Sequence, residues 1–561
     1  MKKLLNNSYF FPIFLFLALY IWHPFALGIY SDDWGLLLSF FVDKPGDMSP
    51  FALDRLQFFV LEFANRPLSG FLYYLVSSIC NYDIFLVHLI ILFLLILTIF
   101  SLNLFYKELY KLINIGHIEA FTTISLTFWI ASPWILGFTV WLSSALNLAS
   151  LIFFLLSSYI LLKNWRLGKN KFLLASLLYL LSCLTYESFY FQYLIIIGIG
   201  FIFKIQNRLG KKALVLPLSL YSFVLLIAIV WNRYSSTIFG QAIHKETNSY
   251  WIQTFIANLF ALPYSLFASV LELSYILAPI CLIITYLLLK TLILEKKHDN
   301  REIKSLIFVV KLIVIGILLA ILIYSFAGYT IWGIGSRSRT LIVPSIYFPL
   351  LFSIFFYIIA KYSNIKKKYL YILIIITIIC LSIMNIIRSI EWHNAWLYQK
   401  EIISKLPTEQ LQNLDSTTTV IFDGPYRQNW ISIIDAAWAI DFQFKYGHIY
   451  NKNESDFQPS TNANFEVGRA MMHPILNKPY NLYWDGEYIY TGYDFDSISL
   501  NSLKAKYYNK IDTIRAKKLI IWHYDNNTLE YPTAPIKLSF QPFYNYDYWI
   551  TWIWINWFKK A

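Results

Sequence analysis

Long apolar runs, repeated along the first 390 residues, constrain the fold of this chain more than any other feature. Each run holds about 17 to 25 mostly apolar residues, enough for an α-helix to cross a hydrocarbon layer of about 30 Å. Charged residues make up only 14% of the chain, whereas soluble domains carry roughly 25%. The chain is therefore predicted to be an α-helical polytopic membrane protein with about eleven transmembrane helices. The predicted spans lie near residues 9–29, 83–105, 119–135, 143–163, 172–186, 188–204, 213–232, 274–294, 305–325, 341–360 and 370–387.

Short loops between the apolar runs hold most of the Lys and Arg residues and determine the predicted orientation. Lys2 and Lys3 precede the first run, so the positive-inside rule places this end in the cytoplasm. The lysine-rich loops all fall on that side only if residues 68–80 and 251–271 do not span. We therefore expect both segments to lie along the outer surface or to re-enter it; the alternative is two short spans and lysine-rich loops outside. The predicted location is the inner, cytoplasmic membrane.

Charge, cysteine spacing and motif content argue against several classes of function. The formal net charge of +13 comes from the basic loops, so topology explains it and no nucleic-acid partner is predicted. The four cysteines lie in or beside apolar runs without metal-ligand spacing, which predicts packing roles. The sequence has no Walker A run, nucleophile elbow, zinc-protease motif or dinucleotide fingerprint, which argues against ATP-driven transport, serine hydrolysis and zinc proteolysis.

The last 170 or so residues differ in composition from the rest, being richer in polar residues, Pro, Asn and Asp. We expect residues 1–389 to form the transmembrane domain and residues 390–561 to form an extracytoplasmic domain of the α/β or α+β class. Residues 418–422 and 518–522 are predicted to be buried strands, and 431–444 has helical spacing. The tryptophan-rich end near 548–558 is predicted to be a packed strand; stacking on sugar rings or contact with lipid headgroups is the alternative.

An acidic pair, Asp32 and Asp33, follows the first apolar run directly, on the predicted outer side. Two carboxylates at a membrane surface suit the transfer of a group to a hydroxyl, because one can accept the hydroxyl proton while the other orients the acceptor or holds a divalent cation. The alternative is a solvated loop or a helix N-cap at Trp34.

The elements that follow the acidic pair suggest a family. Asn65-Arg66-Pro67-Leu68 comes about thirty residues later, then the short predicted surface helix, then His88 near the start of the next run. This order resembles the N-terminal third of the GT-C superfamily of integral-membrane glycosyltransferases, which includes protein mannosyltransferases and bacterial enzymes that modify O-antigen or other envelope glycans. The resemblance covers roughly residues 1–105 and is architectural beyond them.

The resemblance implies a donor in which a sugar is linked to polyprenyl phosphate, and a catalytic base in the first outer loop. Asp32 or Asp33 would be that base, with Asp32 slightly favoured and the choice open. Asp33 would also be the ligand of a possible divalent cation, Mg²⁺ or Mn²⁺, and Arg66 would help to shape the substrate site. Glu187, at a turn between two predicted spans, matches an acidic position of similar members; it is a substrate-binding candidate, or a simple turn residue.

Two further arginines are candidates for binding the donor phosphate. Arg337 and Arg339 flank Ser338 in a glycine-containing loop on the predicted outer side. Arginine binds phosphate oxygens in a bidentate manner, and an outer position runs against the positive-inside trend.

The function expected from these features is transfer of a sugar from a polyprenyl-phosphate-linked donor to an envelope glycan, lipid or protein acceptor on the outer face of the membrane. One alternative is an O-antigen polymerase or ligase, in which outer arginines dominate and the acidic pair has no special role. The other is a transporter or flippase of lipid-linked sugars, which would place its polar residues along the membrane midplane.

Overall fold

The computed structural model divides the chain into two compact units. Unit 1 comprises Met1–Leu27 and Pro50–Ile390, and unit 2 comprises Gly28–Ser49 and Glu391–Ala561. The division after Ile390 falls beside the domain boundary expected from composition, but unit 2 also takes in the segment that follows the first apolar run. The structure describes residues 10–30, 33–37, 53–80, 83–169, 172–207, 210–238, 251–295, 301–327, 329, 331, 333, 335–362, 365–425, 427–428, 431–433, 437–446, 463–467, 480–492 and 512–540.

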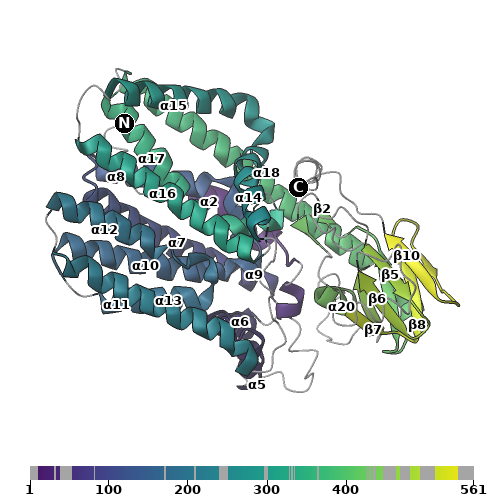
Figure 1. Ribbon diagram of the computed structural model, residues 1–561. Coiled ribbons are helices and arrows are strands. Elements are labelled where there is room, and N and C mark those ends of the chain that lie inside the picture. The colour runs from purple at the N-terminus through teal and green to yellow at the C-terminus, as the bar shows by residue number, and fades with distance from the viewer. Residues whose placement is uncertain are drawn as a thin grey trace. The chain divides into compact units, whose positions relative to one another are not determined.

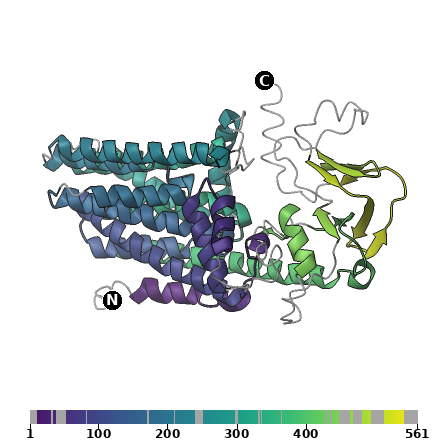
Figure 2. The same cartoon turned by 90° about the horizontal axis from the view of Figure 1, so that it is seen from below.

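Unit 1 is built of helices, and its long helices lie side by side with roughly parallel axes (Figures 1 and 2). The α-helices are α2 Phe10–Tyr20, α3 His23–Ala26, α5 Leu53–Glu62, α6 Pro67–Cys80, α7 Ile84–Leu112, α8 Ile118–Ala131, α9 Leu142–Ala145, α10 Asn147–Arg166, α11 Leu173–Thr185, α12 Tyr193–Asn207, α13 Lys212–Ile238, α14 Trp251–Ala268, α15 Ser274–Glu295, α16 Arg301–Phe326, α17 Pro344–Tyr362 and α18 Lys367–Ser404, the last of which continues into unit 2. The described part of the unit also contains four 3₁₀ turns: η1 Pro133–Phe138, η2 Glu187–Phe189, η3 Leu271–Leu273 and η4 Gly335–Leu341.

Six helices in the described part of the chain are long and apolar enough to cross a membrane. This is the architecture of a polytopic membrane protein, but not the eleven spans that we predicted. Most of the difference arises at the predicted spans 9–29, 119–135, 172–186 and 188–204, whose helices are shorter than the 18 residues or so that a crossing needs. Helix α15 is 22 residues long, but its side chains are described only as far as Lys290. The six are Ile84–Leu112, Leu142–Arg166, Lys212–Ser235, Ile303–Phe326, Pro344–Tyr362 and Lys367–Ser404, and the shorter apolar helices are Phe10–Ala26, Pro67–Cys80, Ile118–Ala131, Leu173–Thr185, Glu187–Ile202 and Ser274–Lys290.

Helix α7 shows how such a helix divides its surface. Its hydroxyl-bearing residues Thr98 and Ser101 lie on the buried face among apolar side chains, while on the exposed face large apolar residues recur every three or four positions. A continuous apolar stripe of this kind is what a helix presents to lipid. The exposed residues of the stripe are Phe85, Leu89, Phe93, Ile96 and Phe100.

Cys281 on α15 is also exposed, so the packing role that we predicted for all four cysteines is wrong at this position.

Interhelical hydrogen bonds fix how the helices pack. The Ser150 hydroxyl of α10 donates to the carbonyl oxygen of Ser182 on α11 at 2.8 Å, and the Ser157 hydroxyl donates to that of Ala175 at 2.7 Å. Residue numbers rise along one helix as they fall along the other, so α10 and α11 are antiparallel. Small hydroxyl residues allow this close approach and satisfy each other away from water.

The two segments predicted not to span are both helical. Residues 68–80 fall within α6, which is amphipathic and buries one face in unit 1. Residues 251–271 fall largely within α14, which continues through Pro263 and is followed by η3. The loss of one backbone donor at Pro263 does not end the helix.

Unit 2 contains mixed and antiparallel sheets. Strands β4 (Asn464–Val467), β1 (Thr418–Asp423) and β8 (Lys518–His523) pair in parallel, and β9 (Thr528–Glu530) joins β8 in antiparallel fashion. The two strands predicted from sequence, 418–422 and 518–522, are therefore neighbours. The predicted helix over 431–444 begins later: β3 comes first and α20 (Ala437–Tyr446) follows.

A second sheet of unit 2 has the strand order β10-β5-β6-β7 and is antiparallel. Its core is shared with the first sheet, since Ile421 of β1 packs in one cluster with Trp484 and Ile489. The strands not yet given are β2 Arg427–Gln428, β3 Ile431–Ser432, β5 Tyr480–Trp484, β6 Tyr488–Gly492, β7 Asp512–Arg515 and β10 Ile536–Phe540. The tryptophan-rich end near 548–558 lies outside the described residues.

Candidate functional site

The two ends of the helix bundle in unit 1 carry separate groups of charged residues. At one end, Glu108 near the end of α7 accepts hydrogen bonds from Arg166 at 2.8 Å and Lys111 at 2.8 Å. Trp165 donates its indole N–H to the carbonyl oxygen of Ala213 at the start of α13, at 2.7 Å. Basic loops far apart in the sequence therefore meet at this end of the unit. Because α11 runs antiparallel to α10, the residues that follow α11 lie at the opposite end.

The central contact at that opposite end joins Arg66 and Glu187. Nε of Arg66 lies 2.7 Å from Oε2 and 2.9 Å from Oε1 of Glu187, and both side chains are about four-fifths buried. The guanidinium carbon lies 4.5 Å from the centre of the Tyr186 ring. Because Nε alone makes the ion pair, the two Nη groups have no hydrogen-bond acceptor among the described residues.

The Arg66 guanidinium keeps its charge in this setting. Burial alone would lower the pKa of Arg66, but the adjacent Glu187 carboxylate and the Tyr186 hydroxyl raise it above its ordinary value. A protonated guanidinium that is bound to its carboxylate through Nε has four further N–H donors on its Nη groups, which suit bidentate binding of an anion.

Backbone contacts hold Arg66 and Glu187 together. Ser69, three residues after Arg66, donates its hydroxyl to the carbonyl oxygen of Thr185 at 2.5 Å. Asn232 on α13 donates to Oε1 of Glu187 at 3.0 Å, and the neighbouring Trp231 donates to the carbonyl oxygen of Ala64 at 2.9 Å. The loop before α6, the turn after α11 and the last turns of α13 thus form one hydrogen-bonded junction.

Arg339 enters the same region from η4. Its guanidinium carbon lies 4.6 Å from the centre of the Trp141 ring and 5.5 Å from that of Tyr329. The Tyr186 hydroxyl interacts electrostatically with both Arg66 and Arg339, so the two guanidiniums share one neighbourhood. Glu187 supplies a negative charge in the neighbourhood of these two arginines.

The position of Tyr329 depends on a buried asparagine. Asn258 of α14 donates to the carbonyl oxygen of Tyr329 at 2.9 Å and to the hydroxyl of Ser325 at 3.0 Å. It also accepts a hydrogen bond from the backbone N–H of Ile331 at 2.8 Å. One side chain thus holds the segment between α16 and η4 at Tyr329 and Ile331 and ties it to Ser325 on α16, which positions the residue whose ring Arg339 contacts.

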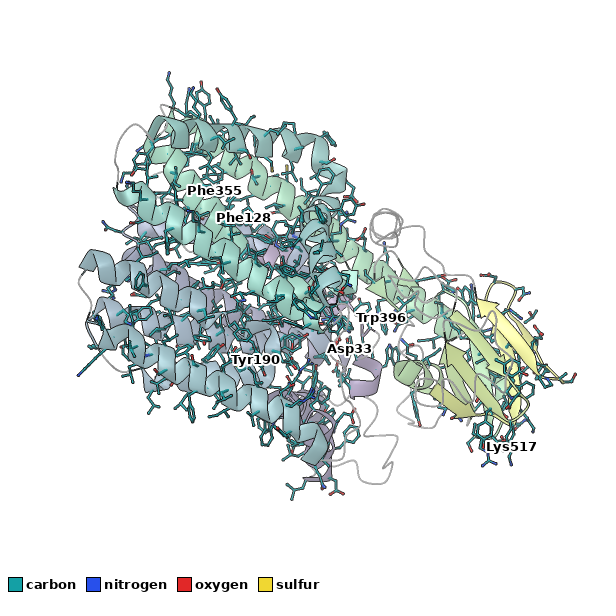
Figure 3. All side chains as sticks on the ribbon, in the orientation of Figure 1. Asp33, Phe128, Tyr190, Phe355, Trp396 and Lys517 are labelled. Carbon is teal, nitrogen blue, oxygen red and sulfur yellow. The ribbon has the colours of Figure 1, made fainter. Side chains whose placement is uncertain are left out.

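Backbone strain occurs four residues after Glu187. Phe191 has a φ of 64°, in the left-handed region that bulky side chains rarely adopt. The next residue, Gln192, is held by an acceptor and a donor: it donates to the carbonyl oxygen of Gly316 at 3.2 Å and accepts from Tyr347 at 2.8 Å. The surrounding structure therefore enforces a strained turn beside the Arg66–Glu187 pair, as is common at functional sites. Tyr190, in this turn, is labelled in Figure 3.

Asp33 belongs to unit 2 and is buried, with 1% of its surface exposed. Its Oδ2 accepts the backbone N–H of Tyr30 at 3.2 Å, and the Tyr30 hydroxyl donates to the carbonyl oxygen of Trp392 on α18 at 2.8 Å. Asp33 and Trp396, both labelled in Figure 3, belong to this packing between the first loop and the end of α18, in which the Trp34 ring lies 6.4 Å from that of Trp396.

The other predicted site residues differ in how far the structure describes them. Asp32 lies outside the described residues, and of Arg337 the structure describes the backbone in η4 but not the side chain. Within the described part of the chain, no group of three His, Cys, Asp or Glu residues is placed to hold a metal ion. A divalent cation at Asp33 stays a prediction, because Asp32, the other acidic residue of the loop, is not described.

A second polar cluster lies in unit 2, where the parallel strands β1 and β8 end. Nδ1 of His523 lies 2.9 Å from Oδ2 of Asp423, and Nε2 lies 3.1 Å from Oε2 of Glu530. Burial alone would lower the pKa of His523, but the hydrogen bonds to Glu530 and Asp423 raise it above its ordinary value. Through its two ring nitrogens, the histidine therefore joins the three strands β1, β8 and β9.

Several residues of the unit 1 site were not predicted from the sequence. Tyr186 was passed over although it precedes Glu187 directly, and Asn232 stands beside the basic residue Arg233 without any motif. Trp141 lies about two hundred residues before Arg339, so no pattern in the neighbouring sequence indicates that the two residues are in contact. Comparison with known proteins gives no further guide, because no family model, curated protein or solved structure matches the chain.

Proposed function

We propose that this protein is a membrane glycosyltransferase of the GT-C type, which transfers a sugar from a polyprenyl-phosphate-linked donor to an envelope glycan, lipid or protein. The observation that supports this function best is the assembly of Arg66, Glu187 and Arg339 at one end of unit 1. Glu187 orients Arg66 through Nε and leaves its Nη groups for a ligand. A pair of guanidiniums fixed against aromatic rings suits a phosphate headgroup.

The position of this assembly supports an outer site. It lies at the end of the bundle opposite Glu108, Lys111 and Arg166, and the positive-inside rule assigns that basic end to the cytoplasm. Soluble nucleotide-sugars are confined to the cytoplasmic side, so an outer enzyme requires a donor carried by lipid. In this proposal the protein acts in the inner membrane, and unit 2 is extracytoplasmic.

The proposed reaction is a displacement at the anomeric carbon. The acceptor oxygen forms the new bond while its proton passes to a carboxylate base, and the bond from the anomeric carbon to the phosphate oxygen breaks. Polyprenyl phosphate leaves with that electron pair, and Arg66 and Arg339 stabilise its charge. Asp33 is engaged by the backbone of Tyr30, so we assign the base to Asp32 and a positioning role to Asp33.

Binding of the donor headgroup tests the arginine site. Purified full-length protein in detergent should bind a polyprenyl monophosphate, and Arg66→Ala and Arg339→Ala should each weaken binding by about tenfold or more. Arg233→Ala is the matched control, because Arg233 is an exposed arginine beside Asn232 at the same end of α13. Equal binding by all four proteins would contradict the proposed site.

Transfer itself is tested in cells that carry the protein. Asp32→Asn should reduce the sugar content of the envelope glycans, whereas Asp33→Asn should reduce the amount of folded protein more than its specific activity. Unchanged glycan composition with Asp32→Asn at normal protein level would exclude the glycosyltransferase mechanism. If the arginine variants alone changed the glycans, a polymerase or ligase would be favoured.

A further inference from the structure

The two 3₁₀ turns η1 and η4 interlock through a glycine and a serine. The backbone N–H of Gly137 in η1 donates to Oγ of Ser338 in η4 at 2.8 Å, and the same hydroxyl donates to the carbonyl oxygen of Gly335 at 2.8 Å. Ser338 has 1% of its surface exposed. The hydroxyl thus uses its donor and an acceptor site to join two segments about two hundred residues apart.

Glycine at position 137 is what allows this approach. A Cβ placed there would overlap Oγ of Ser338 and would lie 2.7 Å from the backbone N of Arg339 and 2.9 Å from the carbonyl oxygen of Gly335. Real Cβ atoms do not come so close to backbone atoms, so a larger residue would displace η4. The residue that η4 would carry with it is Arg339.

The same junction also places the ring that Arg339 contacts. Trp141 follows η1 by three residues, at the start of α9, and its ring lies 4.6 Å from the Arg339 guanidinium carbon. The contact between Gly137 and Ser338 therefore sets the register of η4 against η1. That register brings an arginine and its aromatic platform together.

We propose that Gly137 and Ser338 are positioning residues that set the Arg339 guanidinium for binding an anionic headgroup. This inference rests on the proposed function, because it assumes that Arg339 contacts the donor phosphate. Neither residue needs to touch the ligand; both act through Arg339. A Gly137→Ala exchange should then weaken polyprenyl monophosphate binding about as much as Arg339→Lys does, roughly tenfold.

A double-variant cycle tests this role. Because Gly137→Ala acts through Arg339, adding it to Arg339→Lys should weaken binding of polyprenyl monophosphate no further, whereas a general structural effect would add. Gly116→Ala is the matched control, since nothing lies within 4 Å of a Cβ at Gly116. Additive losses in the double variant, or full binding by Gly137→Ala, would overturn the positioning role.

Hydrogen exchange separates this inference from the proposed function. In the full-length protein, Gly137→Ala and Ser338→Ala should each raise amide exchange in residues 335–341 and leave α6 unchanged. If wild-type protein does not bind polyprenyl monophosphate, the proposed function fails, and the exchange data still decide whether Gly137 and Ser338 set the position of η4. Unchanged exchange in both variants would overturn the inference even where wild-type binding is strong.

Discussion

Arg66 and Glu187 are 121 residues apart in sequence, yet Nε of the arginine lies 2.7 Å from Oε2 of the glutamate. The ion pair is largely buried, and Asn232 adds a hydrogen bond to the same carboxylate. A partly buried pair of this kind costs more to break than an exposed one, because the remaining partner is left without its counter-charge.

Glu187→Gln should therefore lower the free energy of unfolding by about 1–3 kcal/mol. The measurement is reversible unfolding of the purified protein in mixed micelles. Glu119→Gln serves as the control, since Glu119 pairs with Lys107 at 2.7 Å but is 54% exposed; its change should stay below about 1 kcal/mol. Equal losses of unfolding free energy in the two variants would show that the Arg66–Glu187 pair stabilises the fold no more than an exposed ion pair does.

The strained turn at Phe191 predicts a smaller loss of stability than the same substitution would cause in a regular helix. Glycine adopts a φ of 64° without a steric penalty, so Phe191→Gly should release about 1–2 kcal/mol of strain that partly offsets the lost side chain. Phe201→Gly, in helix α12, lacks that compensation and also costs about 1 kcal/mol of helix propensity. In unfolding experiments Phe191→Gly should be the milder change by roughly 2 kcal/mol, and the reverse order would argue against backbone strain at this turn.

The His523 cluster in unit 2 should make stability depend on pH. A pKa raised in the folded state means that the contribution of His523 is complete below its unfolded pKa of about 6.5 and is lost as the pH rises through the folded value. Wild-type protein should therefore exceed His523→Gln in stability by more at pH 6 than at pH 8. Paired denaturation curves at the two pH values measure this, with His393→Gln as the control. A pH-independent difference would show that protonated His523 does not join the strands.

Gly28 in unit 2 faces the ring of Trp396 so closely that a Cβ would overlap the ring atoms. Gly28→Ala should displace the segment that carries Tyr30 and Asp33, at a cost of about 1–3 kcal/mol. Hydrogen exchange at the backbone of Tyr30 and at the end of α18 would report the displacement. Gly210→Ala, where nothing lies within 4 Å, should leave the exchange unchanged; a similar response in both variants would refute this packing.

Hydropathy predicted the helical class of unit 1, because long apolar runs within a membrane satisfy their backbone hydrogen bonds by forming helices. Hydropathy did not predict the number of spans, since several apolar runs form helices too short to cross a membrane, such as Ile118–Ala131 and Leu173–Thr185. The paired strands β1 and β8 were predicted individually from their apolar content. Their parallel register was not, because it depends on chain segments a hundred residues apart.

The candidate site was predicted residue by residue but not as an assembly. Arg66 was selected from the resemblance to GT-C enzymes, Glu187 as a carboxylate at a turn that matches the same resemblance, and Arg339 as an arginine that runs against the topological trend. Tertiary contacts place Glu187 against Arg66 and aromatic rings against Arg339. Such contacts leave no pattern in the local sequence. The acidic pair stood out by position alone, and the structure assigns Asp33 to a different unit from the arginines.

The interlock of Gly137 with Ser338 also has an evolutionary consequence. A residue that fits only because it lacks a side chain can change only if its partner changes as well, so the two positions should vary together or not at all. Any relative of this chain that shares the site should keep glycine at the position of Gly137 and a small hydroxyl residue at that of Ser338, even where the surrounding apolar residues have drifted. A glycine and a serine retained at these two positions would identify a related protein even where overall sequence identity is too low to show the relationship.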